Sequence, residues 1–197
     1  MRADSGSDGG SEQPLDLSEA ERDRVLVVAT DLFTKHGPAT LSLKWVALES
    51  DIPSRRVAAE WRTIELLLSD VLDRLSATFE AQAGDILDSS VAGGDVIEAY
   101  HHIIARALLD GADVSSLARD YSQVERWVKV FQDRFDLDER TARIRLSQTF
   151  ALEWGWRLFG PYLRVACGLP DEPEEVFLTE LRKLQRQILE LPPVDPA

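Results

Sequence analysis

The stretch that decides the fold is SEAERDRVLVVATDLFTKHGPATLSLKWVALESDIPSRRVAAEWRTIELLL, residues 18–68. Ser18 and Glu21 have the spacing of a capping box, in which each side chain serves the other residue's backbone NH. Apolar residues then recur at helical spacing until Gly37, which a proline follows, ends the helix. The order predicts a capped helix, a glycine break, two very short helices and a second capped helix. This is the layout of a helix-turn-helix head.

The two short helices are bounded by residues that favour helix ends and turns. Ser42 suits the N-cap of a helix that ends near Ser50, and Asp51 tolerates the left-handed conformation of a tight turn. Pro53 suits the first turn of the next helix, and Thr63 suits the N-cap of a long one. The residues expected to face the core of the head are apolar: Val25, Val28, Ala29, Leu32, Phe33, Leu43, Val46, Ala47, Val57 and Trp61.

Three stretches carry a family resemblance: RVLVVATDLFTKHG, LSLKWVALESDIP, and Trp61 with the following TIELLLSDVLDRL. They resemble the TetR/AcrR family of one-component transcription regulators, closely over about 50 residues and in general layout over the helical remainder. The resemblance implies a recognition helix in the major groove of DNA and a preceding helix near the phosphates. The residues that it implies at the DNA are Ser42, Lys44, Ser54, Arg55, Arg56, Ala59 and Thr63.

The head departs from the family pattern at several positions. Asp51 stands where the family usually has glycine, and Ala58 stands where it has a phosphate-binding tyrosine. Pro53 and Arg55 replace small or hydroxylated residues, and Glu60 adds a carboxylate expected to lie near the duplex. These departures keep a second hypothesis open, in which the protein is a degenerate relative that binds a small molecule but lacks specific DNA binding.

Charge is distributed unevenly along the 197 residues. The formal net charge is −13, but residues 1–17 carry −3, residues 18–62 carry none and residues 63–197 carry the remaining −10. DNA binding is therefore expected only if basic residues gather on one face of the head, where Lys44, Arg55, Arg56 and Arg62 are available.

Composition places the chain among globular proteins. One cysteine excludes an internal disulfide, and no run approaches the 18 consecutive apolar residues of a membrane span. A cytoplasmic location is the expectation, with no membrane partner. Helical periodicity without strand-like alternation predicts an all-α chain of eight to ten helices. We expect a tail over 1–17, the DNA-binding head over 18–62, a ligand-binding and dimerisation body over 63–191, and a tail over 192–197.

Two stretches of the body have the spacing of helix pairs that assemble into bundles. Residues 144–158, in a helix expected over 138–159, and residues 177–191, in the last helix, carry apolar or small residues in alternating steps of three and four. Packing inside one chain and packing between two copies explain such seams almost equally well, and the family resemblance favours a homodimer. The residues expected at its interface are Ile144, Ala151, Leu158, Phe177, Leu181, Leu184 and Ile188.

The body is also rich in aromatic residues where a ligand pocket would be useful. Ordinary core packing remains the alternative for each of them, as it is for Trp45 and Trp61 in the head. His101 and His102 are adjacent, so they point about 100° apart on a helix and do not suit one metal ion. The residues expected to line a pocket are Tyr100, His101, Tyr121, Trp127, Phe131, Phe150 and Trp154.

No catalytic motif stands out: the chain has no phosphate-cradling glycine loop, no H-E-x-x-H pattern and no G-x-S-x-G elbow. We expect no enzyme activity, no cofactor and no metal site. The expected function is a ligand-responsive transcriptional regulator, a repressor released from an operator by a small apolar or amphipathic effector. The alternative stays the DNA-silent, ligand-binding dimer.

Overall fold

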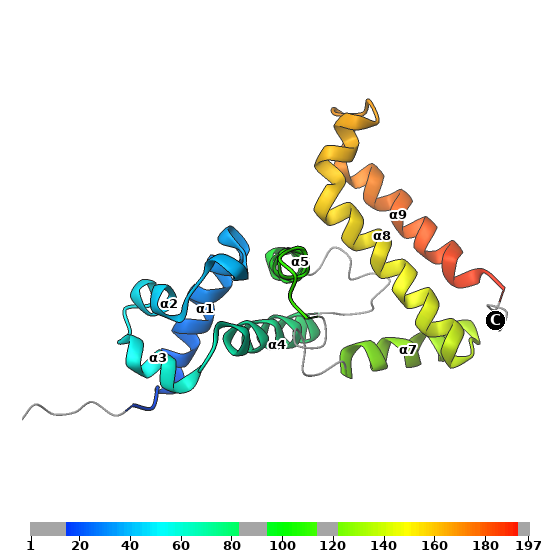
Figure 1. Ribbon diagram of the computed structural model, residues 1–197. Coiled ribbons are helices and arrows are strands. Elements are labelled where there is room, and N and C mark those ends of the chain that lie inside the picture. Colours follow the sequence, from blue (N-terminus) through cyan, green and yellow to red (C-terminus); the bar gives the residue numbers. More distant parts are fainter. Residues whose placement is uncertain (1–14, 83–93, 114–121, 193–197) are drawn as a thin grey trace, which may run out of the picture.

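The computed structural model describes residues 15–82, 94–113 and 122–192, and every regular element in them is helical (Figure 1). The all-α prediction is therefore confirmed. The helices are α1 (Glu19–His36), the 3-10 turn η1 (Pro38–Thr40), α2 (Leu43–Glu49), α3 (Ser54–Glu60), α4 (Ile64–Gln82), α5 (Gly94–Leu109), α7 (Ser122–Phe135), α8 (Glu139–Ala166) and α9 (Glu174–Glu190). No described helix is long and apolar enough to cross a membrane.

The ends of α1 follow the predicted local chemistry. The Ser18 hydroxyl accepts a hydrogen bond from the backbone NH of Glu21, and a Glu21 carboxylate oxygen accepts from the backbone NH of Ser18 at 2.8 Å. Gly37 ends the helix at φ 78°, a conformation that residues with a Cβ rarely adopt. Arg106 of α5 donates to the last α1 carbonyl, that of His36, at 3.2 Å. The capping box and the glycine stop are thus confirmed.

The turn between α2 and α3 also forms as predicted. Ser42 caps α2 by accepting a hydrogen bond from the backbone NH of Trp45, and Asp51 adopts a left-handed φ of 55°. The Thr63 hydroxyl accepts from the backbone NH of Leu66 at 3.3 Å, which caps α4. Because each cap satisfies an orphan NH, α2 and α4 begin where the sequence indicates.

Two separate apolar clusters hold the described residues together. The first runs from the head into the body: it joins α1, α2 and α3 to α4 and α5 without a break, and it includes the fully buried Phe33 and Val71. The second lies among α7, α8 and α9 around Phe131, Leu146 and Leu189. The head is therefore packed on the long α4 helix, while α7 to α9 have a core of their own. The domain boundaries stay a prediction.

Helices α8 and α9 form a hairpin at one end of the molecule (Figure 1). α8 runs to Ala166, beyond the predicted end at residue 159, and it contains Pro161 within its last turns. The continuation is held by Arg164, which donates to the carbonyl oxygens of Pro170 and Glu172 in the following loop, at 2.9 and 2.5 Å. Trp156 of α8 stacks on Phe177 of α9 with ring centroids 4.7 Å apart.

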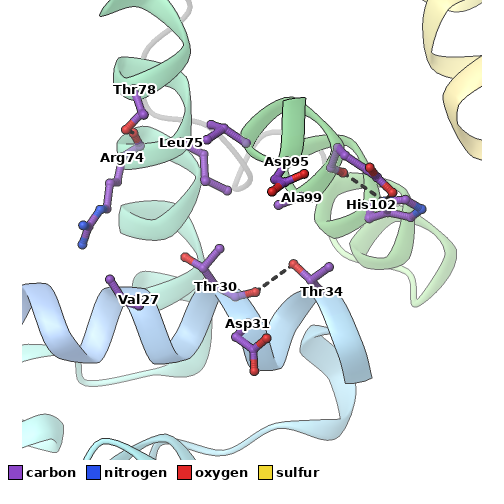
Figure 2. Close-up of a pocket in the computed structure, with 12 residues that line it drawn as sticks. Val27, Thr30, Asp31, Thr34, Arg74, Leu75, Thr78, Asp95, Ala99 and His102 are labelled. Atoms are coloured by element: carbon purple, nitrogen blue, oxygen red, sulfur yellow. Dashed lines mark hydrogen bonds and ion pairs between the residues drawn. The ribbon is translucent and has the colours of Figure 1, made fainter. Parts of the chain in front are cut away.

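A groove lies where the head meets the body. Helix α1 forms one wall, α4 the second and α5 the third, and the space between them is about 700 Å³ (Figure 2).

Candidate nucleic-acid interface

Six of the seven residues predicted to contact DNA lie on the surface of the head. Lys44 on α2 is exposed, as are Ser54, Arg55 and Ala59 on α3. The exposed Ser42 and Thr63 are the caps of α2 and α4. Figure 1 shows α2 and α3 together at the end of the molecule far from α8 and α9. The arrangement leaves hydroxyl groups and long cationic side chains accessible to a partner.

Arg56 contradicts the prediction that it is exposed. Its side chain is buried, and its guanidinium donates to both carboxylate oxygens of Glu21, at 2.5 and 2.8 Å, and to the backbone carbonyl of Asp16 at 2.7 Å. Arg56 precedes the fully buried Val57, so it lies on the side of α3 that faces α1. A guanidinium held in this way is not available to a phosphate. Arg56 is instead the residue that fastens α3 to the start of α1.

Glu21 serves two purposes in that contact. Its carboxylate completes the capping box of α1 and also receives Arg56. The hydrogen bond from Arg56, followed by those from Ser18, lowers the pKa of Glu21 to about 2. The carboxylate is therefore ionised throughout the physiological range, and the Arg56 charge is neutralised locally.

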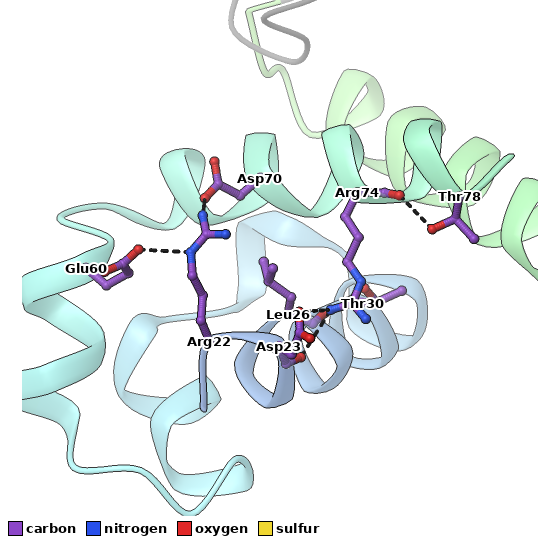
Figure 3. Close-up of polar contacts among 8 residues, drawn as sticks. All are labelled: Arg22, Asp23, Leu26, Thr30, Glu60, Asp70, Arg74 and Thr78. Atoms are coloured by element: carbon purple, nitrogen blue, oxygen red, sulfur yellow. Dashed lines mark hydrogen bonds and ion pairs between the residues drawn. The ribbon is translucent and has the colours of Figure 1, made fainter. Parts of the chain in front are cut away.

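A second cluster joins the end of α3 to α1 and α4 (Figure 3). Arg22 of α1 donates to Glu60 of α3 at 3.0 Å and to Asp70 of α4 at 2.5 Å. The indole NH of Trp61 donates to the same Asp70 oxygen at 2.9 Å, and the Arg22 guanidinium lies 5.6 Å from the Trp61 ring centroid. The Glu60 carboxylate, expected to lie near the duplex, is thus turned back toward α1 and paired.

Arg74 and Asp23 form a weaker link between α4 and α1. The Arg74 guanidinium lies 3.3 Å from the Asp23 carboxylate and 3.2 Å from the Asp23 carbonyl oxygen, and both side chains are well exposed to solvent (Figure 3). Sequence reasoning missed the roles of Arg22, Asp23 and Arg74. For Arg22 a signal was available in the sequence. It lies three residues before Val25 and four before Leu26, which places it on the inward-facing side of α1.

The tryptophans of the head serve packing, as expected. Trp61 is buried, and Trp45 packs on the first apolar cluster. Trp45 also packs against the His36 ring in a tilted arrangement, with ring centroids 5.1 Å apart, and donates its indole NH to Glu49 at 3.3 Å. Its ring is therefore engaged within the chain.

Comparisons with known proteins agree with this geometry. No protein-family model matches the chain. Two curated relatives, an HTH-type transcriptional repressor of Mycobacterium tuberculosis and an HTH-type transcriptional regulator of Mycobacterium bovis, are each 34% identical to it over 151 residues. The alignments cover 75% of this chain and 77% of each relative. The chain belongs to the HTH-type transcriptional regulators. A protein of this kind acts on DNA.

A solved structure supports the fold of this HTH-type regulator. A protein from Streptomyces coelicolor, provisionally described as a transcriptional regulator, superposes with a TM-score of 0.58 and 19% identity, covering 86% of this chain and 96% of the other. The relatives and the all-helical fold are in line with the TetR/AcrR resemblance.

The residues predicted to line a ligand pocket divide into two groups. Trp127 and Phe131 are buried in the second apolar cluster, so the structure places them in the core of α7 to α9. Phe150 lies between the groups, because it packs against that cluster and also stacks on Trp154 with centroids 6.0 Å apart. Tyr121 lies outside the described residues.

The other group surrounds His101 on α5. Its ring lies 4.6 Å from the Trp154 ring and 5.8 Å from the Tyr100 ring. Burial, together with the nearby charge of Arg157, lowers the pKa of His101 to about 3, so the imidazole is neutral. Its Nδ1 is buried and has no hydrogen-bond partner, which is costly unless a ligand or water supplies one.

The residues predicted at a dimer interface are partly occupied within the chain. Phe177 stacks on Trp156, and Leu181 lines a small space between α8 and α9, so both contribute to the hairpin. Ala151 and Leu184 are exposed. The remaining three, Ile144, Leu158 and Ile188, are half-buried. Within the described residues, no group of three or more histidine, cysteine, aspartate or glutamate side chains could hold a metal ion.

Proposed function

We propose that this HTH-type regulator is a homodimeric repressor that a small effector releases from an operator. In each head, α3 would enter the major groove with Ser54, Arg55 and Ala59 toward the bases. Lys44 and the two caps, Ser42 and Thr63, would contact the backbone. The observation that carries the proposal is the different placement of two adjacent arginines of α3. Arg55 is exposed, and Arg56 anchors the helix to α1.

Charge placement supports DNA binding by an acidic protein. The inward carboxylates of Glu21 and Glu60 are paired with Arg56 and Arg22, so their charges are compensated close to α3. The cations left facing solvent on this part of the head are Lys44, Arg55 and Arg62. Two heads would bring six such groups to the duplex, which predicts a slope of about −5 for log affinity against log salt.

An exposed apolar face supports the homodimer. Ala151, Leu158 and Tyr162 lie on one side of α8 at steps of seven and four, with the exposed Phe159 beside them. A Cβ added at Gly155, which lies on the same side, would meet nothing within 4 Å, so a second helix could approach there. Two α8–α9 hairpins joined along this face would make a four-helix interface and place two heads for adjacent half-sites.

The surroundings of His101 support an effector site in the body. A neutral imidazole with a buried, unpartnered Nδ1 beside Trp154 offers one directed hydrogen bond in an aromatic environment. That combination suits an apolar molecule with a hydroxyl, carbonyl or similar group. The effector would release DNA only by its differential affinity for two head arrangements.

The degenerate relative remains the second candidate because of two observations in the head. Ala58 is exposed where the family pattern has a tyrosine hydroxyl, and Arg56 is withdrawn from the surface. Each removes one phosphate contact. Weak binding that ignores sequence and disappears at moderate salt would favour this candidate.

The deciding experiment is footprinting on the DNA upstream of the protein's own gene, with excess competitor DNA. We compare the wild type with Arg55→Ala and with the control Arg186→Ala, which removes an exposed arginine from α9 at the far end of the molecule. A protected palindrome that only Arg55→Ala abolishes would support the repressor. No specific binding there, followed by none in a genome-wide selection, would contradict it.

A further inference from the structure

The groove between α1, α4 and α5 has no part in the function proposed above, although its lining suits a small ligand. Its volume of about 700 Å³ would hold a small organic molecule, and its walls come from both the head and the body (Figure 2). The groove is open to solvent. Its lining residues are Val27, Thr30, Asp31 and Thr34 from α1, Arg74, Leu75 and Thr78 from α4, and Asp95, Val96, Glu98, Ala99 and His102 from α5.

Part of the lining is apolar. Val27 is more than half exposed in the groove, and Leu75 reaches it from the first apolar cluster. Val96 and Ala99 pack on the same cluster from α5. A ligand with a hydrocarbon or aromatic body could therefore remove apolar surface from water there.

The threonine hydroxyl groups of the lining each donate a hydrogen bond to a backbone carbonyl of their own helix. Thr30 donates to the Leu26 carbonyl at 2.7 Å and Thr34 donates to the Thr30 carbonyl at 2.8 Å. Thr78 donates to the Arg74 carbonyl at 2.9 Å. A threonine bonded in this way can only accept a further hydrogen bond. All three therefore offer methyl groups and acceptor oxygens to the groove.

The histidine of the groove also has one ring nitrogen engaged within the chain. His102 Nδ1 lies 3.0 Å from the backbone carbonyl of Glu98. A carbonyl oxygen cannot donate, so Nδ1 carries the hydrogen in this contact and is not available to a ligand as an acceptor.

The charges of the groove are mostly negative. Asp31, Asp95 and Glu98 supply three carboxylates, and the one guanidinium in the lining belongs to Arg74, which is engaged with Asp23. Asp31 is paired with Lys35 on the surface at 2.8 Å, and both side chains are more than half exposed. Such exposed pairs are weak, so Asp31 can still attract a second cation. The lining thus combines apolar surface, acceptors and negative charge.

We propose that this groove binds an organic ammonium ion with an apolar body. The ammonium would lie beside one of the carboxylates of Asp31, Asp95 and Glu98, with the others adding to the negative potential of the groove, and the body would cover Val27 and Leu75. The site is separate from the aromatic surroundings of His101, which faces a different side of α5. Because the walls belong to α1 and α5, an occupant would bridge head and body, and any head movement that changes their separation would change its affinity.

A matched set of three probes tests the charge requirement: 4-phenylbutylamine, 4-phenylbutanol and 4-phenylbutyrate. We expect the amine to bind about tenfold more tightly than the alcohol and the carboxylate to bind least, by titration calorimetry on the full chain. Asp31→Asn/Glu98→Gln should weaken the amine about tenfold, whereas Asp133→Asn/Glu190→Gln, which removes the same charge from exposed sites on α7 and α9, should leave it unchanged.

The histidine ring signals in NMR spectra report where the amine binds. The chain has three histidines: His36 lies beside Trp45 in the head, His101 lies in the aromatic surroundings and His102 lines the groove. The amine should shift the His102 signals while leaving those of the other two in place. Equal affinity for amine and alcohol, equal affinity of both double variants, shifts at His101 alone, or no saturable binding would each overturn the proposal. The test needs neither DNA nor an effector, so it is independent of the repressor function.

Discussion

The head and the α7 to α9 region are held together by different kinds of contact. In the head, α2 and α3 have seven residues each. Ser42 caps α2, and ion pairs reach from α1 to α3 and α4. In the other region, α8 alone has 28 residues and the core is apolar and aromatic, as at Phe131 and Phe177. An ion pair between Arg143 of α8 and Glu125 of α7 lies outside that core, with both side chains exposed. Both regions have an apolar core, but in the head a buried guanidinium, that of Arg56, joins two helices, whereas the ion pair between α7 and α8 is exposed to solvent.

Helix length explains this difference. A seven-residue helix has too few internal hydrogen bonds to offset the free-energy cost of helix nucleation, so an isolated helix of this length is unstable in water. α2 and α3 also bury few apolar side chains, namely Val46, Ala47 and Val57. Directed contacts such as Arg56 with Glu21 must therefore fix α3 in place, and they do so without covering the face that is left for DNA.

The strongest test of the comparison is Phe131→Ala. Phe131 is 2% exposed and packs edge to face on Phe135. As a core residue, it should lower the free energy of unfolding by about 3 to 5 kcal/mol when truncated, measured by urea titration. Leu109→Ala, at a side chain that is 83% exposed, is the control and should change little. If Phe131→Ala lowered the free energy of unfolding only slightly, the result would instead favour the sequence-based prediction that Phe131 lines a ligand pocket.

The second test is the pH dependence that His101 imposes. Its pKa is near 3 in the folded protein and near 6.5 in the unfolded chain. Between pH 3 and pH 6.5, therefore, the imidazole is protonated in the unfolded state and neutral in the folded state. Stability must therefore fall as the pH drops below 6.5, by about 2 kcal/mol at pH 5. His101→Gln should remove this part of the loss in urea titrations at pH 7 and 5. The exposed His36→Gln serves as the matched control, and an unchanged slope in His101→Gln would contradict the buried, neutral imidazole.

Local signals predicted the head well. The capping box of Ser18 and Glu21, the stop at Gly37 and the turn at Asp51 involve residues within four positions of each other, so the sequence contains both partners side by side. Arg56 was assigned wrongly because its partner, Glu21, lies 35 residues away. Nothing in the seven residues of α3 distinguishes an arginine that faces α1 from one that faces solvent.

The helices from α5 to α9 were harder to predict because one residue type serves several purposes there. Aromatic residues at helical spacing suit a pocket and a core equally, and only packing places Trp127 in the core and leaves His101 with an unpartnered nitrogen. The apolar seam of α9 likewise suited two interfaces, and Phe177 is engaged within the hairpin. The sequence predicted that this helix ends at residue 159, yet α8 continues through Pro161 to Ala166, and Arg164 of this continuation binds a loop carbonyl.

The third test separates the two adjacent arginines of α3. Arg56→Ala leaves the Glu21 carboxylate without its main partner and should lower the melting temperature by several degrees, by circular dichroism. Arg55→Ala, at an exposed side chain, should melt like the wild type and lose DNA affinity. If both variants melted alike, Arg56 would not be the residue that fastens α3.

Acid should weaken the same contact. The pKa of Glu21 is lowered from 4.5 to about 2, so its stabilising effect is complete above pH 4.5 and is lost as the pH falls toward 2. The stability difference between the wild type and Glu21→Gln should therefore shrink over that range. A difference that stays constant from pH 5 to pH 2.5 would show that the carboxylate is not held by Arg56.

The smallest effect is expected for Arg74→Ala, and it tests whether burial decides which ion pairs matter. Arg74 and Asp23 are 36% and 64% exposed, so water screens their attraction, whereas the Arg56 side chain is 10% exposed. We expect Arg74→Ala to cost about 0.5 kcal/mol in urea titrations. It removes a cation from the groove wall as well, so it should strengthen 4-phenylbutylamine binding while hardly changing stability. A loss as large as that of Arg56→Ala would mean that the number of links between α1 and its neighbours, rather than their burial, holds the head in place.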